Sequence, residues 1–194
     1  MNIEFEPFVR LCCTLTADQM FVALERDYGF RLSYRIDRDG RVYDRYAYRP
    51  GKYTNSPLLV CHADTVLQCL DYHYDDTSGL VVSSELDDRL GIACLLYSLS
   101  IGNDLSDCAM LVCDDEEIGQ STASVYTDDI LESEVQDRPN WLLEFDRRGT
   151  DVVTYCYGND TLHSLLELVG FNIGSGSFSD ISVMERLGRS GINV

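Results

Sequence analysis

Clusters of carboxylate and imidazole side chains follow several apolar runs in this sequence. These clusters are His62-Ala63-Asp64 after residues 58–61, Asp114-Asp115-Glu116-Glu117 after residues 108–113, and Asp146 after residues 141–145. Between the first two, Asp87-Asp88 opens a segment with helical apolar spacing. A histidine combined with carboxylates suits zinc, manganese or cobalt better than calcium, which takes oxygen ligands alone. Two such cations that share one carboxylate can generate a nucleophile from water and polarise a carbonyl, which is hydrolytic chemistry.

The apolar runs predict the elements that position these clusters. Strands are expected over residues 31–36, 41–48, 58–61, 80–82, 108–113, 141–145 and 152–157, and helices over 16–28, 87–99, 162–169 and 181–187. Unbroken apolar runs are typical of strands buried on both faces, and alternating strands and helices indicate a mostly parallel sheet. The predicted fold is therefore an α/β three-layer sandwich with helices on both faces of a central sheet. Because ligands bind at the carboxyl ends of such strands, the clusters are expected to converge there.

Composition narrows the class of protein. The chain has 194 residues, 33 Asp and Glu against 15 Lys and Arg, a net charge of -18 and 45% hydrophobic residues. That hydrophobic content predicts a folded chain, here one domain over residues 1–194. The negative charge argues against nucleic-acid binding through a basic face. The chain has no apolar run of membrane-spanning length, no secretory leader and no C-x-x-C pair among 8 cysteines. These features predict a cytoplasmic protein with reduced thiols and no membrane partner.

Four ordered motifs carry a family resemblance. They are His62-x-Asp64-Thr65-Val66, Leu86-Asp87-Asp88-Arg89-x-x-Gly91, Glu116-Glu117-x-Gly119 and Asp146-Arg147-Arg148-Gly149. Over about residues 16–194 this order resembles the co-catalytic zinc exopeptidases, which include aminopeptidases, di- and tripeptidases, carboxypeptidases and deacylases. The resemblance implies a metal-dependent hydrolase of peptide or amide bonds, with a small peptide or N-acyl amino acid as substrate. It also implies two divalent metal ions, zinc first, with manganese or cobalt as alternatives.

The resemblance further implies a role for each motif residue. His62 and Asp146 would bind the first metal, Asp87 would bridge both metals, and Glu117 would bind the second. Asp64 would orient the His62 ring, and Glu116 would act as general base toward the hydroxide that bridges the metals. Other readings stay open: Asp87-Asp88 as a helix cap, Glu116-Glu117 as a solvated pair, and His62 as a core histidine.

One departure from the family concerns the last metal ligand, a histidine that follows the final strand. Residues 191–194 match the start of that strand, and no histidine follows; His73 and His163 lie in other contexts. We expect the chain to lack the C-terminal segment with this motif, and the alternative is an incomplete second site. The incomplete site favours a second hypothesis, a non-catalytic protein of this fold that binds a peptide, a partner or a metal. For a substrate carboxylate, Arg89, Arg147 and Arg148 are equal candidates.

Overall fold

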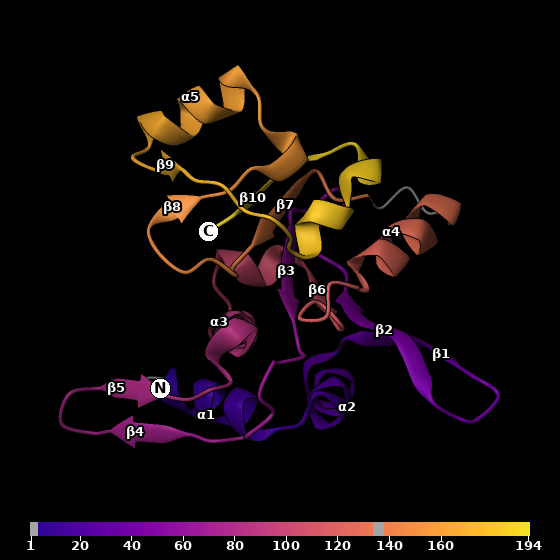
Figure 1. Ribbon diagram of the computed structural model, residues 1–194, viewed down its shortest axis with the longest axis vertical. Coiled ribbons are helices and arrows are strands. Elements are labelled where there is room, and N and C mark those ends of the chain that lie inside the picture. The colour runs from indigo at the N-terminus through magenta and orange to yellow at the C-terminus, as the bar shows by residue number, and fades with distance from the viewer. Residues whose placement is uncertain (1–3, 134–137) are drawn as a thin grey trace.

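A six-stranded mixed sheet forms the centre of the protein in this computed structural model, which describes residues 4–133 and 138–194 (Figure 1). The strands run in the order β1-β2-β6-β3-β7-β10. Their bounds are β1 (Arg31–Ile36), β2 (Val42–Arg49), β3 (Leu58–His62), β6 (Ala109–Cys113), β7 (Trp141–Glu144) and β10 (Ser190–Asn193). Strands β6, β3, β7 and β10 pair in parallel, whereas β1 and β2 are antiparallel to their neighbours. The predicted mostly parallel centre is confirmed.

Helices cover both faces of this sheet. The α-helices are α1 (Glu6–Thr14), α2 (Ala17–Tyr28), α3 (Leu86–Ile101), α4 (Ala123–Glu132) and α5 (Asp160–Leu168). Helices α1, α2 and α3 pack with Leu59, Cys61 and Val112 on one face. Helix α4 packs with Val60 and Leu111 on the other. Strands β3 and β6 are buried along their whole length because both faces are covered, which confirms the three-layer sandwich.

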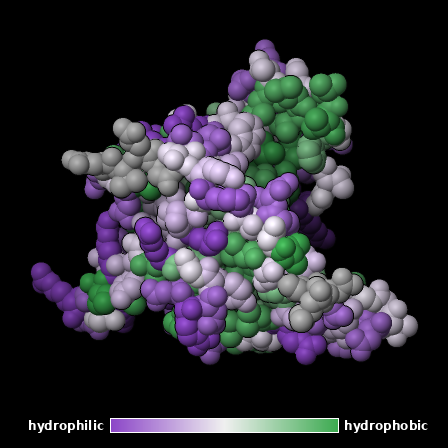
Figure 2. Space-filling model, turned by 180° about the vertical axis from the view of Figure 1, so that it is seen from behind, coloured by the Kyte–Doolittle hydropathy of each residue, from purple (hydrophilic) through white to green (hydrophobic). Residues whose placement is uncertain are grey.

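The remaining elements are short. They are β4 (His73–Asp75), β5 (Leu80–Val82), β8 (Asp151–Val152), β9 (Asn172–Ile173) and the 3₁₀ helices η1 (Asp104–Asp107), η2 (Tyr155–Tyr157), η3 (Asp180–Val183) and η4 (Glu185–Leu187). Helix α5 lies with β8 and β9 at the top of Figure 1. A hydrophobic patch marks this region in Figure 2, where the exposed apolar side chains are Leu165, Leu168, Val169 and Phe171. In the described part of the chain, no helix has the length and apolar character needed to span a membrane.

Two predicted elements are wrong. The strand expected over residues 152–157 is limited to β8, because Tyr155 has a φ of 42° and the chain turns into η2 there. The helix expected over 181–187 is two 3₁₀ helices, in which Met184 N–H bonds to Ile181 O and Leu187 N–H to Met184 O. Helices α1 and α4 were not foreseen from the sequence.

Candidate metal centre

Four elements bring the predicted site residues to one edge of the sheet. His62 is the last residue of β3, which lies between β6 and β7. Glu116 follows β6, Asp146 follows β7, and Asp87 lies in the first turn of α3. Because β3, β6 and β7 are parallel, their carboxyl ends lie side by side, and the predicted convergence follows from this topology.

The His62 imidazole is the centre of the cluster. Its Nε2 atom lies 3.7 Å from Asp87 Oδ1, 3.9 Å from Asp146 Oδ1 and 3.9 Å from Glu116 Oε2. This nitrogen is buried and has no hydrogen-bond partner. Ligand atoms of His62, Asp87 and Asp146 all lie within 4.8 Å of one another, the one such group of three found in residues 4–133 and 138–194. With metal–ligand bonds of about 2 Å, donors on one zinc ion lie within roughly 4 Å of each other, so the cluster needs only slight contraction to hold a cation.

Asp64 orients the His62 imidazole through its Nδ1 atom and also holds the loop after β6. The Nδ1 atom of His62 lies 3.0 Å from Asp64 O and 3.4 Å from Asp64 Oδ1. The two carboxylate oxygens of Asp64 accept hydrogen bonds from the backbone N–H groups of Glu116 at 3.2 Å and Glu117 at 3.0 Å. Burial raises the pKa of Asp64, but the bonds from His62 and these N–H groups outweigh it, so the pKa is lowered. One carboxylate therefore aligns the imidazole with both glutamates.

Comparisons with known proteins bear on the fold of the chain. No protein-family profile and no curated protein matches the sequence. Among solved structures, the chain resembles a Zn-dependent exopeptidase from Parabacteroides distasonis (TM-score 0.57, 11% identity, 98% of this chain and 82% of that one). It also resembles an aminopeptidase from the archaeon Desulfurococcus kamchatkensis (TM-score 0.57, 13% identity, 98% and 86%). The chain has the zinc-exopeptidase fold.

A tripeptidase from Staphylococcus aureus matches at a TM-score of 0.48 and 18% identity, over 78% of this chain. The chain spans 45% of the length of that tripeptidase.

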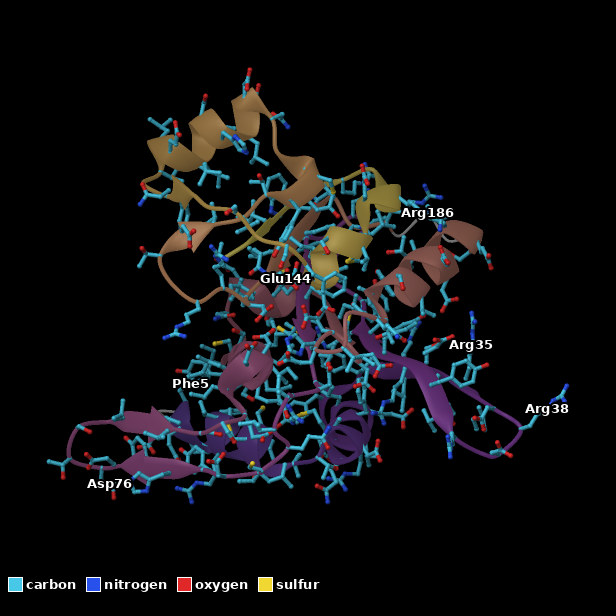
Figure 3. All side chains as sticks on the ribbon, viewed as in Figure 1. Phe5, Arg35, Arg38, Asp76, Glu144 and Arg186 are labelled. Atoms are coloured by element: carbon cyan, nitrogen blue, oxygen red, sulfur yellow. The ribbon has the colours of Figure 1, made fainter. Side chains whose placement is uncertain are left out.

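Three more carboxyl groups lie buried in this zinc-exopeptidase fold, close to the cluster. Asp88, Glu144 and Asp180 are 3%, 0% and 0% exposed, and each has one oxygen with no hydrogen-bond partner. Glu144 Oε1 accepts from Asp180 N–H at 2.9 Å, and Asp180 Oδ1 accepts from the Ser121 hydroxyl at 2.5 Å. Glu144 lies at the centre of the molecule in Figure 3. Burial raises the pKa of all three groups. The burial of Glu144 and Asp180 was not predicted from the sequence; for Glu144, the available signal was a carboxylate inside an apolar strand.

Burial and neighbouring charges shift the pKa values of the cluster residues in different directions. Burial would lower the pKa of His62, but the neighbouring carboxylates of Asp64 and Asp87 raise it well above the ordinary value. The nearby His62 imidazole lowers the pKa of Asp87 to about 2, whereas burial and the neighbouring Asp87 carboxylate raise the pKa of Asp146 to about 9. Burial also raises the pKa of Glu116.

We expect the metal-free protein to lose stability as the pH rises from about 4 to 9. A group whose pKa is higher in the folded than in the unfolded protein stabilises the fold fully at pH values below its unfolded pKa. That stability is lost as the pH rises through its folded pKa. For Asp146 that window runs from 3.8 to about 9. His62, whose pKa is also raised, acts in the same direction. The thermal unfolding midpoint of the metal-free protein, measured from pH 5 to pH 9, tests this expected loss of stability. A midpoint that rises with pH in the metal-free protein contradicts the assignment.

Gly91 leaves room for the Asp88 carboxylate beside the cluster. A Cβ atom at Gly91 would lie 2.3 Å from Asp88 Oδ1, which accepts the Gly91 N–H at 3.1 Å. We expect Gly91→Ala to lower the free energy of unfolding by about 1–3 kcal/mol through this overpacking. Urea denaturation measures the change. Gly→Ala in a helix normally stabilises by about 1 kcal/mol, so a stabilised variant would show that Asp88 moves freely.

Several other candidates lie outside the cluster. Arg89 is 2% exposed, and its guanidinium donates to Cys12 O and Leu15 O, so its role is to join α3 to α1. Arg147 forms a two-bond ion pair with Asp151. Arg148 is exposed. Of the histidines, His73 is exposed on β4, and His163 Nε2 lies 2.9 Å from Thr154 Oγ1.

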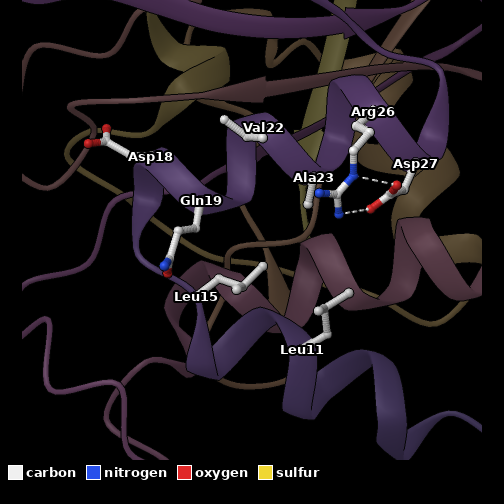
Figure 4. Close-up of a pocket in the computed structure, with 8 residues that line it drawn as sticks. All are labelled: Leu11, Leu15, Asp18, Gln19, Val22, Ala23, Arg26 and Asp27. Atoms are coloured by element: carbon white, nitrogen blue, oxygen red, sulfur yellow. Dashed lines mark hydrogen bonds and ion pairs between the residues drawn. The ribbon is translucent and has the colours of Figure 1, made fainter.

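A groove of about 360 Å³ lies apart from the metal-centre residues, between α1 and α2 (Figure 4). Its apolar lining comes from Leu11, Leu15, Val22 and Ala23. It shares no residue with the cluster.

Proposed function

We propose that this protein is a metal-dependent hydrolase that cleaves a peptide or amide bond in a small peptide or an N-acyl amino acid. The observation that carries the proposal is the buried, unpartnered Nε2 atom of His62, which faces the carboxylates of Asp87, Asp146 and Glu116. An imidazole nitrogen without a hydrogen-bond partner is costly in a protein interior, and a cation accounts for both the free Nε2 atom and the gathered carboxylates.

Two divalent ions, zinc in the first instance and manganese or cobalt otherwise, fit the proposal. His62, Asp146 and Asp87 would hold the first ion, and Asp87 with Glu117 would hold the second. When bound, the metal supplies positive charge that polarises a carbonyl and makes water more acidic. Glu117 lies outside the group within 4.8 Å, so the first site is the better formed of the two.

Glu116 is the proposed general base. Its carboxylate lies beside the cluster, and its backbone is held by Asp64. Burial brings its pKa closer to neutrality, which suits a group that takes a proton from water and returns it to a leaving amine. Asp64 keeps the proton of His62 on Nδ1, so that Nε2 is free to bind the ion.

Metal stoichiometry and a substrate panel test the proposal together. Zinc titration by calorimetry is followed by assays on aminoacyl and N-acyl amino acid substrates. The control is His163→Gln, which removes a histidine outside the cluster. We expect zinc binding and hydrolysis in the wild type and in this control. Zinc binding without turnover of any substrate would instead favour the non-catalytic alternative, and no zinc binding would contradict both the metal site and the hydrolase.

A further inference from the structure

Asn193 holds the backbone of Asp146 from the neighbouring strand. Its side chain is buried at 1% exposure at the end of β10. The Oδ1 atom accepts from Asp146 N–H at 3.1 Å, and Nδ2 donates to Asp146 O at 3.3 Å. One amide thus bonds both polar groups of the Asp146 backbone. These contacts restrict rotation of the segment that carries the carboxylate.

The two bonds from Asn193 lie just beyond the point where β7 and β10 stop pairing, and this position explains what the bonds do. Strands β7 and β10 pair in parallel up to Glu144 and Asn193, and Val194 N–H bonds to Glu144 O at 3.0 Å. Asp146 comes after this ladder, where backbone pairing no longer constrains the chain. The Asn193 amide replaces the missing ladder bonds at that point, so Asp146 leaves the strand in one defined direction.

Asn193 is itself held on two sides. Its backbone exchanges two hydrogen bonds with Val153, each 2.9 Å long. Its Nδ2 atom also lies 3.3 Å from the hydroxyl of Tyr155, which donates to Phe178 O at 3.4 Å. Tyr155 has a positive φ of 42°, and its ring packs on Gly176, where a Cβ atom would lie 3.0 Å from the hydroxyl. The side chain of Asn193 therefore has little freedom to leave Asp146.

We propose that Asn193 is a positioning residue that sets the Asp146 carboxylate for metal binding, with Tyr155 as its support. The inference rests on the proposed function, in which Asp146 is a metal ligand. Groups that orient metal ligands typically change metal affinity by 10–100-fold when they are removed. Asn193 acts through the backbone of the ligand, so the lower end of that range applies.

The test compares Asn193→Ala with Asn159→Ala. Asn159 is exposed, caps α5 through Leu162 N–H and contacts none of the cluster residues, so it controls for the loss of an asparagine side chain that bonds a backbone N–H elsewhere in the chain. We expect Asn193→Ala to weaken zinc binding about tenfold by calorimetry and to speed hydrogen exchange of the Asp146 amide. Asn159→Ala is expected to change neither. Unchanged zinc affinity in Asn193→Ala, or an equal loss in both variants, overturns the proposal.

Tyr155→Phe covers the case in which Asn193→Ala does not fold. It removes only the hydroxyl, so weaker zinc binding at an unchanged thermal midpoint supports the network, and unchanged affinity overturns it. A wild-type chain that binds no zinc contradicts both the proposed function and the positioning role of Asn193. If the wild type binds zinc and Asn193→Ala and Tyr155→Phe bind it equally tightly, the positioning role of Asn193 is wrong and the proposed function stands.

Discussion

Glu116→Gln is expected to lower the rate of hydrolysis by roughly 10²- to 10⁴-fold, the usual contribution of a positioned acid or base. Glutamine matches glutamate in size, so the loop after β6 keeps its bonds to Asp64. The amide cannot take a proton from water or return one to a leaving amine. Because the compact group around His62 contains Asp87 and Asp146 rather than Glu116, zinc stoichiometry is expected to stay unchanged.

The matched control for this substitution is Glu132→Gln on the exposed end of α4, which removes the same charge away from the cluster. Initial rates at saturating substrate and zinc content per chain are measured for both variants. Activity that survives in Glu116→Gln would show that the base lies elsewhere. Loss of zinc along with activity would instead make Glu116 a metal ligand.

His62→Ala is expected to weaken zinc binding by more than about 100-fold, since even groups that only orient a ligand are worth 10–100-fold. The substitution removes the one imidazole in the cluster and leaves the carboxylates of Asp87, Asp146 and Glu116 facing one another. Zinc at 100 times its dissociation constant stabilises a protein by about 2.7 kcal/mol. The wild type should therefore unfold at a higher temperature when zinc is added, and the variant should not.

His73→Ala serves as the control, because this exposed histidine on β4 lies outside the cluster. The variant should keep both zinc affinity and the zinc-induced rise in unfolding temperature. If His73→Ala loses them as fully as His62→Ala, zinc binds at the surface and the proposed centre is wrong. Calorimetry at 25 °C, well below unfolding, separates a lost ligand from a destabilised fold.

The sheet and the convergence of the motifs could be predicted because local pattern and topology agree there. The apolar runs that became β3 and β6 could be recognised as strands buried on both faces, and both are. Polar residues immediately after such strands must lie at the carboxyl edge of a parallel sheet. His62 and Asp146 therefore could be placed near each other from spacing and order, before any distance was known.

Prediction failed where long-range contacts override local preference. Residues 152–157 have the composition of a strand, yet Val153 pairs with Asn193 only as an isolated bridge and Tyr155 turns the chain. Residues 181–187 have helical spacing, but the hydrogen bond from the Tyr157 hydroxyl to Ile181 O joins them to η2. Such partners lie too far along the chain for periodicity to reveal them.

For this protein, the sequence by itself determined which chemical groups are present and in what order: one imidazole and five carboxylates, at strand ends and at a helix start, from His62, Asp64, Asp87, Glu116, Glu117 and Asp146. Those properties are local, because hydrophobic runs and the residues after them set strands and their ends. Only the tertiary structure decided how the groups are held. Asp64 joins His62 to the Glu116 backbone, and Asn193 holds Asp146. These bonds join segments that the fold brings together, and hydrogen-bond geometry exists only once the strands have packed.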